Sequence, residues 1–337
     1  MLDLPGYRLL GTSKAAGANV LFEAVREADG LPVLLKTPAA VAPGSRERER
    51  YRREFAILKR LQGVRGVIQA HACELLFERP VLVLEAVKGL SLSEVLGLPC
   101  DASWFLEFAI PLAATLEEVH RQHVIHKDLQ PDHILIEPSG NVRLTDFGAA
   151  TLQQREHLEA APTDLLEGTL TYMSPEQTGR MNRALDYRTD FYSLGVTFYT
   201  LLTGTPPFQG HDALEWFHAH LAQSPRPPHE RVPGLSPTLS AIVMKLLAKV
   251  AEERYQSAAG LRADLERCRE GLRRGVHELF PLGQKDGATG FQLPQRLHGR
   301  EATVARLLQS FERVAQGGPP ELLLVHGASG MGKTAVV

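Results

Sequence analysis

The stretch HKDLQPDHILIEPSGNVRLTDFG, residues 126–148, decides the fold. It contains two short apolar runs, HILIEP and VRLTDFG, which are typical of short strands. Asp128 comes before the first run and Asp146 comes at the end of the second. The segment therefore predicts two strands that present candidate functional carboxylates in the loops beside them.

The residues before this stretch predict a small antiparallel sheet with one helix. The runs YRLLG, NVLFEAV and PVLLKT, within residues 7–36, alternate with turn signals and predict a meander. Residues 46–61, RERERYRREFAILKRL, place Phe55, Leu58 and Leu61 at helical spacing among charges, which predicts an amphipathic helix. VIQAHACELLF and PVLVLEAV predict another strand pair.

After Gly89 the pattern becomes mostly helical. Apolar faces of period 3.6 predict helices over residues 104–122, 188–202, 213–223, 237–249 and 258–273. Residues 274–294 lack strong periodicity and are rich in glycine, which predicts a linker. Beyond it, residues 300–315 read as a helix and ELLLVH as a buried strand.

Composition and charge exclude several classes of protein. With 337 residues, of which 44% are hydrophobic and 23% charged, the chain is globular and long enough for about two domains. A net charge of -2 gives no general attraction to nucleic acid or anionic lipid, and we expect neither as a partner. The three cysteines, Cys73, Cys100 and Cys268, show no metal spacing and are expected to be reduced thiols. No membrane segment or signal peptide is recognisable, which favours a cytoplasmic location.

The order of the chemical motifs resembles the eukaryotic-type protein kinase family. Lys36 ends a strand, Glu54 lies on the next helix, the loop 126–133 follows, then Asp146-Phe147-Gly148, and then SPE at 174–176. This order matches the lysine, glutamate, catalytic loop, DFG and APE elements of the family over about residues 7 to 270. The resemblance implies a bilobal α+β kinase fold, with a β-rich N-lobe and a helical C-lobe.

The resemblance also implies a role for each motif residue in phosphoryl transfer from ATP. Lys36 is expected to hold the α- and β-phosphates, and Glu54 to hold the Lys36 ammonium in place. Asp146 is expected to bind Mg²⁺, which prefers carboxylate oxygen. Asp128 is expected to orient the substrate hydroxyl or to accept its proton.

Further contacts are implied on both sides of the reaction centre. Besides Lys36, the positions expected to contact ATP are Ser13, Ala15, Gly17, Val20, Glu85 and Val87. Residues 168–208 resemble the substrate-binding segment and central helix of Ser/Thr kinases, and Thr169 is matched to their hydroxyl specificity. Three residues are expected to be structural: Glu176 and Arg254 as a buried ion pair, and Asp190 as a cap of the catalytic loop.

Four departures from the family pattern concern the reaction centre. The three glycine positions of the phosphate loop are Ser13, Ala15 and Ala18, although Gly11 and Gly17 lie nearby. The loop has Gln130 where the family has a lysine, which removes a positive charge. It has His133 in place of a metal-binding asparagine, and imidazole is a poor Mg²⁺ ligand. It has Lys127 in place of an arginine, so the two-pronged contact to an activation-loop phosphate is lost.

These departures leave two functional hypotheses. The first is a Ser/Thr protein kinase in a bacterial signalling relay, because Lys36, Glu54, Asp128 and Asp146 are all present. In that case Gln130 is counted with the catalytic group and His133 with the metal site. The alternative is a pseudokinase, a non-catalytic module that binds nucleotide or a partner and regulates an attached ATPase.

The end of the sequence contains a second nucleotide motif. GASGMGKT, residues 327–334, follows ELLLVH and matches the Walker A pattern. Its expected phosphate and metal contacts are Gly327, Gly330, Gly332, Lys333 and Thr334. LPQRLHGRE, residues 293–301, looks like the start of an AAA-type signalling ATPase.

The motifs together predict four parts of the chain. These are a kinase N-lobe at 1–87, a C-lobe at 88–273, a linker at 274–298 and the truncated start of an α/β P-loop ATPase at 299–337. A kinase followed by such an ATPase resembles large bacterial sensors that continue into GAF and histidine kinase modules. The resemblance therefore implies downstream ATPase and sensor modules, with Ser/Thr-containing proteins as substrates.

Overall fold

The computed structural model describes residues 4–11, 14–40, 43–97, 99–152, 170–181, 183–276, 279–287, 301–315 and 318–326. The chain divides into two compact units, Met1–Thr289 and Gly290–Val337. The first unit contains the predicted kinase fold, and each unit is described by itself.

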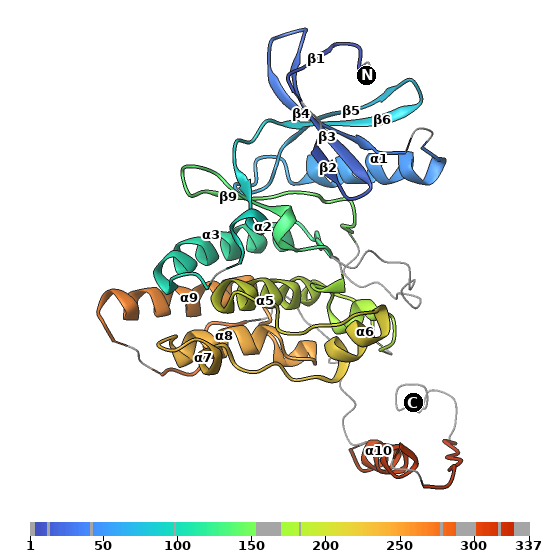
Figure 1. Cartoon of the computed structure of the whole chain (residues 1–337), viewed down its shortest axis with the longest axis vertical. Coiled ribbons are helices and arrows are strands. Elements are labelled where there is room, and N and C mark those ends of the chain that lie inside the picture. The colour runs from blue at the N-terminus through green and yellow to red at the C-terminus, as the bar shows by residue number, and fades with distance from the viewer. Residues whose placement is uncertain are drawn as a thin grey trace. The chain divides into compact units, whose positions relative to one another are not determined.

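The N-terminal part of the first unit is an antiparallel sheet. Its strands are β1 (Tyr7–Leu9), β2 (Lys14–Ala16), β3 (Asn19–Arg26), β4 (Pro32–Pro38), β5 (Ala70–Leu76) and β6 (Arg79–Glu85). The strand order is β1-β3-β4-β6-β5, and β2 pairs with β3 as a hairpin (Figure 1). The predicted meander and strand pair are therefore confirmed, and they join into one sheet.

Strand alternation divides the side chains of this sheet between two cores. Val81 and Val83 of β6 pack in a small cluster with Val33 and Leu35 of β4. Leu82 and Leu84, which alternate with these two valines along β6, belong instead to the main core of the first unit. Successive residues of a strand face opposite sides of the sheet. Lys36, the residue after Leu35, therefore lies on the face opposite the small cluster.

Helix α1 (Ser45–Arg60) packs against β5 and β6. Its inner face carries Tyr51, Ile57 and Leu58, all nearly inaccessible to water. Glu54 lies on this same face with only 2% of its surface exposed. The helix therefore brings one acidic group into an otherwise apolar contact with the sheet.

Residues 126–148 supply two strands of a second, three-stranded sheet. Its strands are β7 (Leu90–Ser91), β8 (Ile134–Ile136) and β9 (Val142–Leu144), in that order. A short helix α2 (Leu92–Val95) follows β7, and a 3₁₀ turn, Pro131–His133, leads into β8. The two strands predicted from the stretch 126–148 both form, and they hold the loops that carry Asp128 and Asp146.

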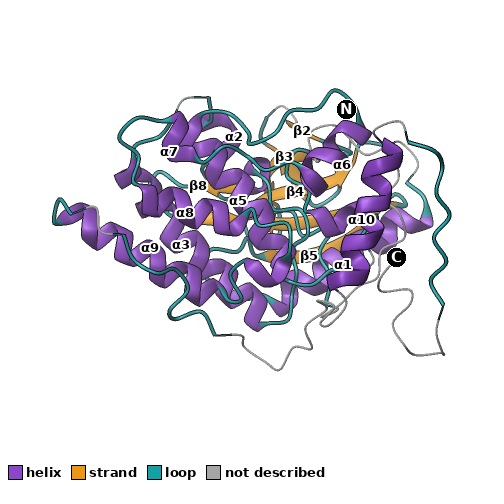
Figure 2. Ribbon diagram, turned by 90° about the horizontal axis from the view of Figure 1, so that it is seen from below, coloured by secondary structure: helices purple, strands orange, loops and turns teal. Residues whose placement is uncertain are grey.

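The other described residues of the first unit are mostly helical. The helices are α3 (Ala102–Arg121), α5 (Arg188–Thr203), α6 (Ala213–Ala222), α7 (Pro228–Arg231), α8 (Pro237–Leu246) and α9 (Ala258–Arg273), with 3₁₀ turns at Pro175–Thr178 and Ala251–Glu253. Helices α3 and α9 lie side by side, and α5 packs on α8 (Figure 2). The α5–α8 contact is close at Gly195, where an added Cβ would lie 2.7 Å from Cβ of Leu246. The five predicted helices are confirmed, whereas the short α7 was not predicted.

Part of the segment assigned to a linker is bonded to the helical lobe. The Asp286 carboxylate accepts hydrogen bonds from the backbone N–H of Gln256 at 2.8 Å and from the Ser257 hydroxyl at 2.9 Å. A Cβ on Gly260 would lie 2.5 Å from an Asp286 oxygen, so this glycine permits the approach. These hydrogen bonds attach part of the predicted linker to the helical lobe. Apolar periodicity does not reveal such contacts, because they are made by polar groups.

The second unit contains α10 (Glu301–Ala315), as predicted. The prediction of a buried strand for ELLLVH is wrong for the described residues 321–326, which form no strand. Leu322 is 96% exposed and Leu324 is 83% exposed. A buried strand requires neighbouring strands, and residues 301–315 and 318–326 supply none. Nowhere in the described part of the chain does a helix combine the length and apolar character needed to cross a bilayer.

Candidate active site

A lysine and a glutamate meet between the N-terminal sheet and helix α1. The Nζ of Lys36, on β4, donates to both carboxylate oxygens of Glu54, on α1, at 2.8 and 2.9 Å. Lys36 is only 4% exposed. Strand alternation places Lys36 on the helix side of the sheet, and the inner face of α1 places Glu54 opposite it.

Asp146, directly beyond β9, completes a cluster of three charges. Its Oδ1 accepts from Lys36 Nζ at 3.0 Å and from the backbone N–H of Gly148 at 3.2 Å. Asp146 has a φ of 56°, in the left-handed region that aspartate tolerates better than most residues. A Cβ at Gly148 would lie 3.1 Å from this Oδ1 and 3.4 Å from Glu54 Oε2, so the glycine lets the backbone approach both carboxylates.

Burial and charge act on the three groups in different directions. Burial alone would raise the pKa of Asp146, but the Lys36 ammonium and the His133 ring outweigh it and hold this pKa well below the usual value. Burial raises the pKa of Glu54, and the charge of Lys36 offsets only part of that rise. Burial lowers the pKa of Lys36, yet the two carboxylates more than compensate and raise it overall. Lys36 is therefore a fixed cation, and Asp146 stays ionised.

The second half of the site is the loop before β8. The Oδ1 of Asp128 accepts from the Gln130 side-chain amide at 3.0 Å. The Nδ1 of His133 lies 2.8 Å from the backbone carbonyl of Asp128, and its Nε2 lies 3.7 Å from Oδ2 of Asp146. Asp128 is half-buried. The predicted residues Asp128, Gln130 and His133 thus gather beside Asp146, with the histidine between the two aspartates.

Asp190, in the first turn of α5, accepts hydrogen bonds from the backbone of this loop. Its carboxylate accepts from the backbone N–H of His126 at 3.0 Å and of Lys127 at 2.9 Å, and it lies 2.8 Å from His120 Nε2. Lys127 has a φ of 64°, an unusual conformation for a lysine. A buried carboxylate that binds two successive N–H groups stabilises this strained turn.

The ion pair expected between Glu176 and Arg254 is present. Arg254 donates to the two carboxylate oxygens of Glu176 at 2.7 and 2.8 Å, and both residues are almost inaccessible to water. Arg254 also donates to the backbone carbonyls of Arg188, Ala248 and Lys249. A buried guanidinium with every donor direction used is a rigid anchor for the segment after the site.

The residues expected at the nucleotide are spread over the N-terminal sheet. Ala15 of β2 pairs with Val20 of β3, and Gly17 makes the turn between them with a φ of 57°. Glu85 is bonded already, because its carboxylate accepts from the backbone N–H of Gln69 at 2.8 Å. Val87 packs against the main core. Other expected positions lie outside the described residues: Ser13, Thr169, and Gly327, Gly330, Gly332, Lys333 and Thr334 of the Walker A motif.

The donor set at Asp146 suits one hard cation rather than a protein-made cage. Among the residues that the structure describes, no group of three or more histidine, cysteine, aspartate or glutamate side chains converges as a metal site. Asp146 offers ionised oxygen, whereas the neighbouring His133 offers nitrogen. Mg²⁺ is commonly held by one or two carboxylates with phosphate oxygens and water, so the residues fit a metal that arrives with a phosphate ligand.

Sequence reasoning missed some residues of this region. Gln177 donates to the backbone carbonyl of Lys127 at 2.6 Å and ties the turn at 175–178 to the catalytic loop. It also missed three arginines of α1, Arg46, Arg50 and Arg53, which line a pocket beside Asp128. Their spacing of four and three residues along one helix is a signal that could have found them.

Comparisons with known proteins agree with this geometry. A family model described as a protein kinase domain matches residues 10–264, and one described as an AAA ATPase domain matches residues 296–337. The chain is 37% identical over 194 residues to serine/threonine-protein kinase PknB of Mycobacterium tuberculosis, which is 57% of this chain and 31% of PknB. It is 35% identical over 194 residues to a probable serine/threonine-protein kinase of Streptomyces coelicolor, which is 57% of this chain and 28% of that protein. The chain thus spans less than a third of the length of these curated relatives.

Proposed function

Because the chain belongs to the protein kinase family, with part of an AAA ATPase domain after the kinase domain, we propose that it transfers the γ-phosphoryl group of ATP to Ser or Thr hydroxyls of proteins. The observation that carries this proposal is the buried contact of Lys36 with both Glu54 and Asp146, next to Asp128. Phosphoryl transfer depends mainly on positioning and on neutralising negative charge. A cation held rigidly by two carboxylates beside a half-exposed aspartate provides both.

Lys36 and Asp146 act at the phosphate end of the proposed reaction. Lys36 stays protonated because two carboxylates face it, so its Nζ can bind phosphate oxygens without a change in charge. Asp146 stays ionised and would hold Mg²⁺ through its carboxylate. When bound, the metal would neutralise charge on the phosphates. Glu54 keeps the ammonium in place, since both of its oxygens accept from Lys36.

Asp128 acts at the acceptor end. Its carboxylate is half-buried and held by the Gln130 amide, which leaves it able to orient a substrate hydroxyl and to accept the proton. Gln130 supplies a neutral hydrogen-bond donor where the family uses a cation. We therefore expect slower transfer than in a site that contains the lysine, with the same proton acceptor.

The cellular setting is part of the proposal. The named relatives are serine/threonine-protein kinases of bacteria, which supports Ser and Thr as acceptors. We propose that the kinase serves a signalling relay and acts on protein substrates. The AAA ATPase match at residues 296–337 supports a coupled ATPase module in the same chain.

A second candidate function is a non-catalytic module that regulates the attached ATPase. It is favoured by one observation, which is that His133 lies where the family has a metal-binding asparagine, 3.7 Å from Asp146. Its imidazole offers nitrogen in place of the oxygen that Mg²⁺ prefers, so the second metal contact of the family would be lost. In this case ATP or a partner would bind without transfer.

One pair of measurements separates the two candidates. Transfer of labelled γ-phosphate to a general protein substrate is compared between the unchanged chain and Asp128→Asn, which keeps the Gln130 contact. We expect a loss of about 10²–10⁴-fold in the variant, the usual contribution of general base catalysis. Thermal shift with ATP and Mg²⁺ is measured in parallel, and we expect Asp146→Asn to abolish the metal-dependent part. Transfer no greater than that of Asp128→Asn, with stabilisation by ATP alone, would instead support the regulatory module.

A further inference from the structure

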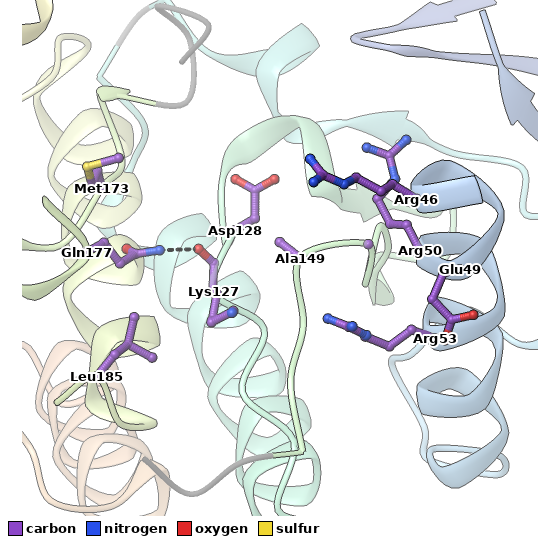
Figure 3. Close-up of a pocket in the computed structure, with 11 residues that line it drawn as sticks. Arg46, Glu49, Arg50, Arg53, Lys127, Asp128, Ala149, Met173, Gln177 and Leu185 are labelled. Atoms are coloured by element: carbon purple, nitrogen blue, oxygen red, sulfur yellow. Dashed lines mark hydrogen bonds between the residues drawn. The ribbon is translucent and has the colours of Figure 1, made fainter. Parts of the chain in front are cut away.

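A pocket of about 710 Å³ opens beside Asp128 and is lined in part by the backbone of Gly148. One wall is helix α1, and the opposite wall includes the catalytic loop and the segment from Met173 to Gln177 (Figure 3). Neither Lys36 nor Glu54 lines it, although Glu54 is on the same helix. The positive side chains that line the pocket are therefore different residues from the lysine that is proposed to hold ATP.

Three arginines of α1 line this pocket. Arg46, Arg50 and Arg53 are four and three residues apart, which places them on one stripe of the helix. Arg50 donates to the side chain of Asn19 at 3.3 Å, a neutral partner. Within the described ranges, Arg46 and Arg53 have no carboxylate within ion-pair distance. Among the described residues, the stripe thus presents positive charge that is not held in an ion pair.

The acids of the same helix do not cancel this charge. Glu49 lines the pocket too, but its carboxylate turns away from the pocket and lies 4.0 Å from Arg52 Nη1 (Figure 3). Arg48, on the far side of the helix, pairs with Glu78 at 2.5 Å. Between Arg46 and Arg53, the helix therefore has two kinds of arginine: those paired with acids on the outside and those that line the pocket.

We propose that this pocket is a subsite that binds an acidic side chain of the protein substrate, close to the residue that is phosphorylated. This proposal rests on the proposed kinase function. Asp128, which is proposed to meet the acceptor hydroxyl, lines the same pocket, so a bound peptide lies within reach of the arginines. Arginine binds carboxylates through paired N–H groups, and a concave site strengthens such contacts by excluding part of the water. The substrate class is thus Ser- or Thr-containing segments with a neighbouring glutamate, aspartate or phosphorylated residue.

Peptide binding tests the subsite without depending on transfer. Fluorescent peptides with one central threonine carry a single glutamate at successive positions on either side, and each has a glutamine twin. Binding to the unchanged chain is measured by anisotropy. At one or more positions we expect the glutamate peptide to bind about five- to tenfold tighter than its twin, a preference that weakens as salt is raised.

The matched variants carry equal changes of charge on the same helix. Arg46→Gln/Arg53→Gln removes two cations of the pocket, and Arg48→Gln/Arg52→Gln removes two from outside it. We expect only the first variant to lose the preference for glutamate, while both keep the affinity for the glutamine peptides. Arg50 is left unchanged because it also contacts Asn19.

Two results would overturn the subsite. One is an equal preference for glutamate in both variants, which would reflect the general charge of the helix. The other is equal affinity of glutamate and glutamine peptides at every position in the unchanged chain. A chain that binds the glutamate peptides selectively but transfers no phosphate would refute the kinase activity and leave the acidic subsite standing.

Discussion

The two lobes each keep a lysine largely away from water, and the two lysines behave differently. Lys36 in the N-terminal lobe faces two carboxylates, at 2.8 and 3.0 Å, and its pKa is raised. Lys249 in the helical lobe donates to the backbone carbonyl of Ala219 at 3.1 Å and to the Tyr192 hydroxyl at 3.3 Å. It lies 4.3 Å from the centre of the Phe208 ring. Burial, with the charge of Arg254 adding to it, lowers the pKa of Lys249 to about 8.

The difference shows that the partners of a buried charge decide its protonation. Burial disfavours the charged form of both lysines, but only Lys36 has ionised oxygens to compensate. Carbonyl and hydroxyl oxygens and an aromatic face replace only part of the lost water around Lys249. A site that must keep a fixed cation therefore requires buried acids as well, which Glu54 and Asp146 supply.

The largest effect is expected from Lys36→Met, which breaks one side of this comparison. It leaves the buried Glu54 and the partly exposed Asp146 without their cation, so we expect a loss of about 3–5 kcal/mol in the free energy of unfolding. Phosphoryl transfer should fall by about 10²–10³-fold, as when a preorganised electrostatic contact is removed. Urea denaturation and a transfer assay measure the two effects.

The same substitution in the other lobe is the control for Lys36→Met. Lys249→Met removes a half-buried ammonium but leaves no acid unpaired among the described residues. Its transfer rate should stay within about twofold of the unchanged chain, since Lys249 is not in the site. Equal losses of stability in the two variants would contradict the role assigned to the carboxylates.

A smaller effect is expected from Lys249, in the way the free energy of unfolding depends on pH. Its folded pKa, about 8, is below the unfolded value of 10.5, so the charged form is penalised in the folded state below pH 8. The unfolded chain then binds more protons between pH 8 and 10.5, and stability from this group rises with pH across that window. With allowance for solvent screening, the rise is about 1–2 kcal/mol. In Lys249→Met this rise should be absent when the free energy of unfolding is measured over the same pH range. An unchanged dependence of that free energy on pH would contradict the prediction.

The smallest effect is expected from Glu252→Gln, which removes a carboxylate that is paired with Arg183. Burial would raise the pKa of Glu252, but hydrogen bonds from Arg183 at 2.5 and 2.6 Å lower it from 4.5 to about 2. Its contribution to stability is present above pH 4.5 and is lost as the pH falls through about 2. Because the group is half-exposed, Glu252→Gln should cost about 1 kcal/mol at pH 7. The difference from the unchanged chain should disappear near pH 2, and a difference that persists there would refute an electrostatic origin.

The sequence was informative wherever a local pattern has a single structural solution. The periodic helices and the two strands around Asp128 and Asp146 form, because alternation and helical spacing are properties of neighbouring residues. The prediction of a buried strand for ELLLVH was wrong for the opposite reason. A buried strand depends on partner strands, which no local pattern supplies. The arginine stripe of α1 was overlooked, because a charged helix face ordinarily points to water.

For this protein the sequence alone determined the order of the elements, the kinase family and the identity of the charged groups. Only the tertiary structure decided that Lys36 is bound by two acids, that His133 lies between Asp128 and Asp146, and that three arginines face a pocket beside Asp128. The physical reason is distance. Charge and hydrogen bonding act over a few ångströms, and the residues that meet here are up to 110 positions apart in the chain.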